Sequence, residues 1–295
     1  DSVSALIYLL IATVINIVLD LYFVAVLGME VAGVALATII AQAISAFLCF
    51  IKLIKMKHLF DLEKRHYILQ KKHSLEIIKL GVPSGLTQGI FSMAMILVQS
   101  LTNSFGEMVI AANVIVMRVD GFAMMPNFSF GNAMTTYTGQ NIGAKEYERV
   151  EEGAKEGTKI AIICASIITA IILLFGNILM YAFTDTAELV HLSMNIMRIL
   201  AIGYIAVSIT QSLSGVMRGA GDTVTPMWIS MCTTVLIRVP VAYGISFLTR
   251  TPELPFGRFE CIHISLLASW CIGALLTAFF FSRGKWKRKA LRMNN

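Results

Sequence analysis

The hydrophobic positions of this chain fall into long apolar runs, and shorter polar stretches separate one run from the next. A helix that crosses a lipid bilayer needs about 20 mostly apolar residues, and eight segments of the chain meet that requirement. The pattern therefore predicts an all-α membrane protein, a polytopic bundle of eight transmembrane helices. They are expected at approximately 3–27, 31–54, 75–101, 108–136, 155–183, 189–217, 226–248 and 262–282.

The composition agrees with a membrane protein. Hydrophobic residues make up 57% of the chain, charged residues 14%, and the mean hydropathy is +0.74, whereas a soluble domain carries about 25% charged residues. The five cysteines are scattered and no pair has the spacing of metal ligands. We interpret them as small core residues, without disulfides or a metal site.

The basic residues are distributed unevenly between the two sides of the predicted bundle. Lys and Arg total 24, and 19 of them lie in or beside the polar segments on one side: around 52–79, from 145 to 159, at Arg218 and from 283 onward. Segments of the other side hold only Arg250 and Arg258. Loops rich in Lys and Arg face the cytoplasm. The sequence therefore predicts a multi-pass protein of the inner (plasma) membrane with a cytoplasmic C-terminus.

A short polar motif occurs twice and indicates an internal repeat. Residues 218–226, Arg-Gly-Ala-Gly-Asp-Thr-Val-Thr-Pro, combine a flexible turn with residues that cap and open a helix. The first four residues, Asp-Ser-Val-Ser, resemble Asp-Thr-Val-Thr at 222–225, and the following apolar runs match at a constant offset of 221. The identities at that offset are Thr13/Thr234, Val14/Val235, Val18/Val239 and Tyr22/Tyr243.

This repeat predicts how the chain is divided. Residues 1–54 are interpreted as the last two helices of an N-terminal lobe, 55–74 as a cytoplasmic linker between lobes, and 75–295 as a C-terminal six-helix lobe with a basic cytoplasmic tail. Two lobes of six helices make a twelve-helix parent, so we expect four further helices of the same protein upstream. The linker alternates apolar and charged residues, which indicates either contact with anionic lipid or a plain connection.

Polar residues recur at helical spacing inside three predicted spans of the second lobe. Because an unpaired polar group is costly in a membrane, such stripes indicate a polar cavity between helices, and we predict a pathway for substrate and ion. Interhelical packing of small and amide side chains is the alternative. The predicted pathway residues are Gln88, Ser92, Gln99, Asn113, Asp120, Asn127, Ser208 and Gln211. Nearby methionines suit an adaptable pocket or fill the core: Met93, Met95, Met117, Met124 and Met125.

Asp120 is the most informative charge, because it lies near the middle of a predicted span. Arg118 is two residues away and falls on a different helix face. We expect Asp120 either to bind a proton, a cation or a cationic substrate, or to pair structurally with Arg198 or Arg238. Prolines within spans leave a carbonyl without its usual partner and predict kinks or hinges. These prolines are Pro83, Pro126 and Pro240.

The sequence offers no sign of an enzyme. It contains no pairing of nucleophile and base, no metal cluster and no phosphate-binding loop, and the glycines at 219 and 221 lack the context of a dinucleotide site. We therefore expect no catalytic residues, no cofactor and no nucleic-acid partner.

Several motifs resemble the multidrug and toxic compound extrusion (MATE) transporters. Gly-Gln-Asn-Ile-Gly-Ala at 139–144, after Met-Met-Pro at 124–126, is similar to the family's eighth helix and following loop. Leu-Gly-Val-Pro at 80–83 is similar to the start of the seventh helix, and Met-Arg-Gly-Ala-Gly-Asp-Thr at 217–223 to the loop between helices ten and eleven. The resemblance covers the whole chain as helices five to twelve.

The resemblance implies a secondary transporter that exports cationic, lipophilic compounds in exchange for inward H⁺ or Na⁺ by alternating access of two six-helix lobes. Its partners would be the small-molecule substrates, the bilayer and the upstream helices. Several family members have carboxylates near the positions of Gln88 and Val207, and both are uncharged here. The sequence is closer to the DinF-like branch, whose proposed coupling residue lies in the first helix.

Two alternatives remain open. A flippase for a lipid-linked saccharide shares this fold and would need a more cationic cavity, with Arg118, Arg198 and Arg238 facing it. A membrane scaffold that does not transport would have fully packed polar stripes and no water-accessible cavity.

Overall fold

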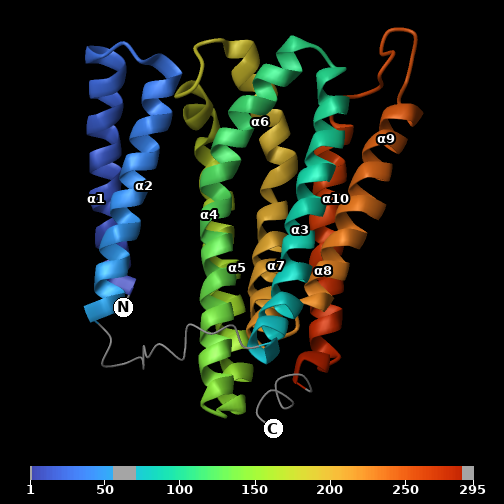
Figure 1. Ribbon diagram of the computed structural model, residues 1–295. Coiled ribbons are helices and arrows are strands. Elements are labelled where there is room, and N and C mark those ends of the chain that lie inside the picture. The colour runs from blue at the N-terminus through green and yellow to red at the C-terminus, as the bar shows by residue number, and fades with distance from the viewer. Residues whose placement is uncertain (1, 56–70, 288–295) are drawn as a thin grey trace. The chain divides into compact units, whose positions relative to one another are not determined.

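The computed structural model describes residues 2–55 and 71–287, and every named element among them is a helix (Figure 1). The chain forms two compact units, 1–74 and 75–295. The predicted linker falls largely on 56–70 and part of the basic tail on 288–295, so both lie mainly outside the described residues. The assignment of the two units to lobes of a larger protein stays a prediction.

The first unit is a pair of helices. Helix α1 (Ser2–Leu21) continues into the π-helical turn η1 (Tyr22–Val26), and α2 (Glu30–Lys55) follows after Gly28, whose φ of 64° suits glycine. The helices approach closely at Gly33, where an added Cβ would lie 2.9 Å from Cβ of Phe23. The Asn16 side chain donates to the hydroxyl of Thr38 over 3.4 Å. Small and amide residues thus hold this pair together, as is common between membrane helices.

The second unit contains the remaining helices. They are α3 (Lys71–Asn103), α4 (Glu107–Gly143), α5 (Tyr147–Tyr181), α6 (Ala187–Ala201), α7 (Gly203–Gly219), α8 (Val224–Met231), η3 (Cys232–Arg238), α9 (Val239–Leu248) and α10 (Cys261–Ser282). Seven helices of the described chain are long and apolar enough to span a membrane, and the bent pair α6 and α7 makes an eighth. The predicted all-α bundle is confirmed.

Two helix boundaries differ from the prediction. The polar stretch 137–154 was expected to connect two spans, but α4 continues through Gly143 and α5 begins at Tyr147. Only Ala144, Lys145 and Glu146 lie between the two helices. The apolar pattern marks the part of a helix that lies in lipid, whereas polar helix formers such as Gln, Glu and Lys extend it beyond.

The bend between α6 and α7 was not anticipated. The two helix axes differ by 45° on either side of Ile202, at a site without proline. The N–H of Ile205 bonds to the carbonyl of Ile202 and not, as in a regular helix, to that of Ala201. The carbonyl of Ala201 accepts a hydrogen bond from the hydroxyl of Thr169 over 2.9 Å. A side chain from α5 therefore satisfies the carbonyl that the break releases. Pro83 and Pro126 lie within continuous helices, and Pro240 follows the π-helical segment η3.

Helices α4 and α7 approach through glycines. A Cβ at Gly215 would strike the carbonyl oxygen of Gly131, and one at Gly219 would lie 2.8 Å from Thr138 Cβ. Close approach of backbones through small residues four apart is a common way to join membrane helices. We call this contact the α4–α7 seam.

The turn between α7 and α8 shows why its motif is polar. Gly221 has a φ of 77°, and the buried carboxylate of Asp222 accepts hydrogen bonds from the backbone N–H of Thr225, 3.3 Å away, and from its hydroxyl, 2.6 Å away. Asp222 therefore satisfies free donors in the first turn of α8. The turn reverses the direction of the chain between α7 and α8. The C-terminal ends of α4, α7 and α10 lie at the same end of this unit (Figure 1).

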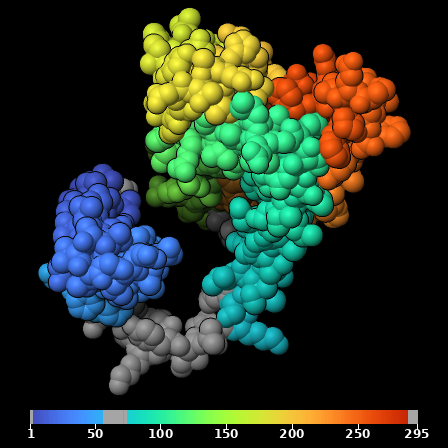
Figure 2. Space-filling model, turned by 90° about the horizontal axis from the view of Figure 1, so that it is seen from above, coloured from blue at the N-terminus to red at the C-terminus, as the bar shows by residue number. Residues whose placement is uncertain are grey.

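Helix α3 is the least packed helix of the second unit. Every described side chain from 74 to 93 is exposed or half-buried, and the buried residues Val98 and Leu101 pack against α9 and α10. Figure 2 shows α3 (cyan) extending away from the rest of the unit. Its C-terminal half therefore anchors α3, and its N-terminal half makes little contact with the rest of the unit.

Candidate functional site

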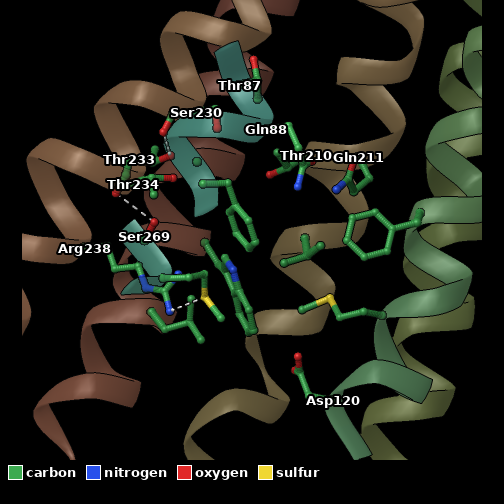
Figure 3. A pocket seen from close by; sticks show the side chains of 18 of the residues that line it. Thr87, Gln88, Asp120, Thr210, Gln211, Ser230, Thr233, Thr234, Arg238 and Ser269 are labelled. Atoms are coloured by element: carbon green, nitrogen blue, oxygen red, sulfur yellow. Dashed lines mark hydrogen bonds between the residues drawn. The ribbon is translucent and has the colours of Figure 1, made fainter. Parts of the chain in front are cut away.

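A cavity of about 840 Å³ lies within the second unit, between α3, α4, α7, α8 with η3, and α10 (Figure 3). Cavities that bind small molecules typically measure about 300–1,000 Å³. Its lining is mainly apolar and includes Phe91, Phe128 and Trp270. Four of the five methionines noted in the sequence also line it: Met95, Met117, Met124 and Met125. The long, flexible side chains of methionine adapt to ligands of different shape.

Asp120 extends into this cavity from α4. Its carboxylate accepts a hydrogen bond from the hydroxyl of Tyr204 over 3.0 Å. Tyr204 is fully buried at the start of α7, and its ring contacts that of Trp270, with 6.0 Å between ring centroids. The bond therefore joins the middle of α4 to α7 directly after the bend at Ile202.

The two arginines expected as alternative partners of Asp120 lie differently. Arg198 is exposed and donates to the side chain of Asn195 over 3.5 Å, so it does not reach the cavity. Arg238 is 5% exposed and lines the cavity from the end of η3. No ion pair joins Arg238 to Asp120 within 4.0 Å among the described side chains. Arg118 is exposed and also lies outside the lining.

His263 is a functional candidate that the sequence analysis missed. It lies in the first turn of α10, is 2% exposed and lines the cavity. Its Nε2 is 3.3 Å from Oδ1 of Asn113 on α4, whereas Nδ1 is buried without a hydrogen-bond partner. A single histidine inside an apolar span is itself a signal of function, and it could have identified this residue.

Five of the eight predicted pathway residues line the cavity: Gln88, Gln99, Asn113, Asp120 and Gln211. Three do not. Ser92 is exposed outside the lining, Asn127 is buried and donates to the Tyr204 carbonyl over 3.4 Å, and Ser208 is buried and donates to the Ile205 carbonyl over 2.8 Å. Asn127 thus contacts a neighbouring helix, whereas Ser208 bonds within its own helix. The pathway role of all eight residues stays a prediction.

Small hydroxyl residues make up much of the remaining polar lining. They were not predicted, because Ser and Thr are frequent in membrane helices and carry little signal singly. Ser269 of α10 donates to the carbonyl of Thr233 in η3 over 2.9 Å, which satisfies backbone of the π-helical segment. The hydroxyl residues labelled in Figure 3 are Thr87, Thr210, Ser230, Thr233, Thr234 and Ser269.

The charge of the lining is mixed. Among the described lining residues, Asp120 is the one carboxylate, and Arg218 and Arg238 are the two guanidinium groups. Arg218 lies in the last turn of α7, and a Cβ added at Gly131 would lie 3.4 Å from its Nη2. Arg218 therefore lies against the α4–α7 seam, near the end of the cavity beside the α7–α8 turn.

Comparison with known proteins places this architecture in a family. The family model described as MatE matches residues 83–244, which is more than half of the chain. The chain belongs to the MatE family. The match includes most of the cavity's helices and ends within α9, so the MatE core and the cavity largely coincide.

Several relatives of this MatE chain are proteins named for multidrug resistance. It is 27% identical over 300 residues to the probable multidrug resistance protein YoeA of Bacillus subtilis, covering 99% of this chain and 63% of the relative. It is 25% identical over 271 residues to the probable multidrug resistance protein NorM of Thermotoga maritima, covering 89% and 55%. The chain therefore spans less than two thirds of the length of these relatives.

Solved structures show the same fold. A crystal structure of MATE in the straight conformation has a TM-score of 0.84 and 22% identity, covering 96% of this chain and 62% of that one. A MOP superfamily transporter from Pyrococcus furiosus, described as having a binding pocket of reverse polarity, has a TM-score of 0.78 and 22% identity, covering 92% and 61%. The MATE resemblance and the MATE fold predicted from the sequence are both confirmed.

Proposed function

We propose that the complete protein is a secondary active multidrug efflux transporter that exports cationic, lipophilic compounds in exchange for H⁺ or Na⁺ by alternating access. The observation that carries the proposal is the cavity of about 840 Å³, apolar and rich in Met and aromatic residues, with one carboxylate among its described lining residues. The names of the relatives support the same class of function. The cavity also argues against a scaffold whose polar stripes are fully packed.

Asp120 is the residue to which we assign binding of the cationic substrate. A buried carboxylate attracts a lipophilic cation that has left water, and aromatic faces around the cavity add to the attraction. The same carboxylate can hold a proton or a coupling cation instead, and binding of one excludes the other. Competition for a single charge couples the two movements when the site opens alternately to the two sides of the membrane. Which ion couples, and whether Asp120 or a group upstream binds it, is left for experiment to decide.

The test is uptake of a fluorescent cationic dye into inverted membrane vesicles that contain the full-length protein. An inward-acidic H⁺ gradient and a matched Na⁺ gradient are imposed separately, and vesicles without the protein are the control. Dye accumulation under one gradient supports the transporter and identifies its ion. No accumulation under either gradient, with the protein present in the membrane, would contradict the proposal.

A flippase for a lipid-linked saccharide is the second candidate, because Arg218 and Arg238 both line the cavity. Only Arg238 belongs to the three arginines that were expected to face the cavity of such a flippase, since Arg118 and Arg198 lie outside it. Translocation of a fluorescent, lipid-linked diphosphate saccharide in proteoliposomes, together with no dye export, would favour this candidate.

A further inference from the structure

The end of helix α10 carries positive charge that no carboxylate nearby in the sequence balances. Arg283, Lys285 and Lys287 follow Ser282, the last residue of α10, and residues 283–287 contain no Asp or Glu. All three cationic side chains are exposed. Lys287 forms an ion pair with Glu151 of α5, whereas Arg283 and Lys285 have no carboxylate within 4.0 Å among the described side chains. Two cations at this end are therefore open to an anion from outside the chain.

The basic segment around the turn between α4 and α5, at the same end of the unit, is different. Residues 145–159 hold four Lys or Arg and five Glu. Its charges are balanced locally, as in the ion pair of Lys159 with Glu156 over 2.7 Å. The rule that places basic loops in the cytoplasm counts Lys and Arg with little regard to Glu, so it does not account for this contrast. Net positive charge is concentrated after α10.

Arg283 continues an exposed apolar row of α10. Leu275 is 70% exposed and Phe279 is 48% exposed, and the spacing of four residues places both on the helix face that leads to Arg283. The guanidinium of Arg283 lies over the ring of Phe279, with 4.5 Å between Cζ and the ring centroid. Because α10 is apolar enough to span a membrane as far as Ser282, the guanidinium lies at the level where hydrocarbon gives way to lipid headgroups.

The turn after α10 is held in place by Trp286. Its side chain is 3% exposed and belongs to a buried cluster with residues of α4, α5, α7 and α8. The indole stacks on the ring of Phe281, with 5.2 Å between ring centroids, and its Nε1–H donates to the Phe281 carbonyl over 3.2 Å. The backbone that carries Arg283 and Lys285 is therefore fixed, which lowers the entropic cost of binding a ligand there.

We propose that Arg283 and Lys285 form a docking site for the headgroup of an anionic phospholipid, whose acyl chains lie along the exposed row of α10. A guanidinium offers planar, paired donors that suit a phosphate group, and the lysine adds charge. Cationic residues beside a membrane attract anionic lipids in this way. A soluble phosphate would lack the apolar contact with Leu275 and Phe279, so the site selects a lipid. This site goes beyond the proposed transport function and does not depend on it.

The experiment measures lipid binding to the purified full-length protein in detergent micelles. Phosphatidylglycerol and phosphatidylcholine, each with the same fluorophore on one acyl chain, are titrated with the protein and followed by fluorescence anisotropy, with empty micelles as the blank. Both lipids have a phosphate, but only phosphatidylglycerol has a net charge. We expect it to bind roughly 30-fold more tightly, because each of two cations contributes about fivefold. Equal affinity of the unmodified protein for the two lipids overturns the site.

Paired variants then locate the preference. Arg283→Gln combined with Lys285→Gln should remove most of the preference for phosphatidylglycerol. Arg149→Gln combined with Lys155→Gln is the matched control, because it also removes two exposed cations, but from the segment rich in Glu, and it should retain the preference. A preference that survives in the first pair, or that both pairs lose equally, would mean another site or a diffuse attraction, and would overturn the proposal.

Two further measurements complete the test. Excess soluble glycerol phosphate should leave the labelled lipid bound, and displacement would show a site for free phosphate and overturn the lipid assignment. Equal midpoints of thermal unfolding show that the variants are folded, and where one is not, the comparison of the two lipids on the unmodified protein still decides. Because no transport is measured, failure of the lipid site leaves the proposed function standing.

Discussion

The hydroxyl of Tyr204 is the group that donates a hydrogen bond to Asp120 among the described residues. This bond fixes the carboxylate at one side of the cavity. The side chain of Asn127 holds the backbone of Tyr204 by donating a hydrogen bond to its carbonyl. At the scale of single residues, the position of the one lining carboxylate thus depends on a tyrosine at the start of α7 and an amide on α4.

Asp120→Asn in the full-length protein should abolish drug resistance with no change in membrane abundance. Asparagine keeps the shape and can still accept the hydrogen bond of Tyr204, so the change removes the charge and little else. Growth in the presence of cationic drugs is measured together with quantitative immunoblots of membranes. Normal resistance at normal abundance would show that the charge of Asp120 is not needed.

Tyr204→Phe should weaken transport by about tenfold, because a hydrogen bond to a charged group contributes about 1.5–3 kcal/mol. In an Asp120→Asn background it should cause little further loss of dye binding, since both changes act on the same bond. Initial rates of dye export in vesicles measure the single variant, and dye binding to the purified proteins measures the pair. Independent, multiplying effects of the two substitutions would contradict a functional link.

Gln88→Ala and Gln211→Ala should change the range of exported compounds more than the amount of protein. Both amides line the cavity, so each substitution removes a hydrogen-bond donor and an acceptor that ligands can use. Ser92→Ala is the matched control, because Ser92 belongs to the same predicted stripe as Gln88 but lies outside the lining. An unchanged resistance profile for both glutamine variants would indicate that these side chains serve packing.

The sequence could identify polar faces, but it could not separate a cavity from an interface. Asn113 and Asn127 are 14 residues apart on one face of α4, yet Asn113 lines the cavity and Asn127 is buried against α7. Periodicity fixes the face of a helix, and what lies opposite that face depends on the partner helix. Tyr204 was missed for a related reason, since a tyrosine within an apolar span is ordinary until its hydroxyl partner is known.

At the scale of helices, hydropathy located every span because membrane thickness sets the length of an apolar run. It could not predict the 45° bend at Ile202, because the cause lies in another helix: Thr169 of α5 takes up the carbonyl of Ala201. It also ended α4 too early, since the polar residues after 136 are as helical as the apolar ones before them.

The hinge role of Pro83, Pro126 and Pro240 stays a prediction. Pro126 lies in α4 between Asp120 and the α4–α7 seam, so movement there would displace the carboxylate relative to the seam. Pro126→Ala restores an N–H donor and should slow dye export while leaving dye binding intact. Export at the unmodified rate would remove Pro126 as a hinge.

Adding even one methyl group at the α4–α7 seam should destabilise the protein. Gly215→Ala places a methyl group against the carbonyl oxygen of Gly131, and overpacking of this kind costs about 1–3 kcal/mol. Gly139→Ala is the matched control on the same seam, because its Cβ would meet the Gly219 carbonyl oxygen at an ordinary 3.7 Å. Thermal unfolding of the purified protein should show a lower midpoint for Gly215→Ala only. Equal midpoints would mean that the seam is looser than described.

At the scale of the whole molecule, the ends of the helices of the second unit carry different charges. Lys145, Arg149 and Arg218 lie at the end where α4 meets α5 and α7 meets α8, and Arg250 and Arg258 lie at the other end, between α9 and α10. Because loops rich in Lys and Arg face the cytoplasm, the cytoplasmic location of the first end and of the C-terminus stays a prediction.

Reporter fusions test this orientation. Green fluorescent protein fused to the C-terminus of the full-length protein should fluoresce, and alkaline phosphatase at the same place should be inactive. Fusions after Glu253, which is exposed between α9 and α10, should give the opposite results. Active phosphatase at the C-terminus would reverse the predicted topology.

The close backbone contact of the α4–α7 seam has a consequence for how the cavity can change shape. Two helices joined through glycine against carbonyl cannot slide past each other without a clash, so Gln211 on α7 keeps a nearly constant distance from Gly131 on α4. The opposite border is α3, whose first half packs loosely. The wall of the cavity at the seam is therefore rigid, and the wall formed by α3 yields to the bulk of whatever molecule is bound.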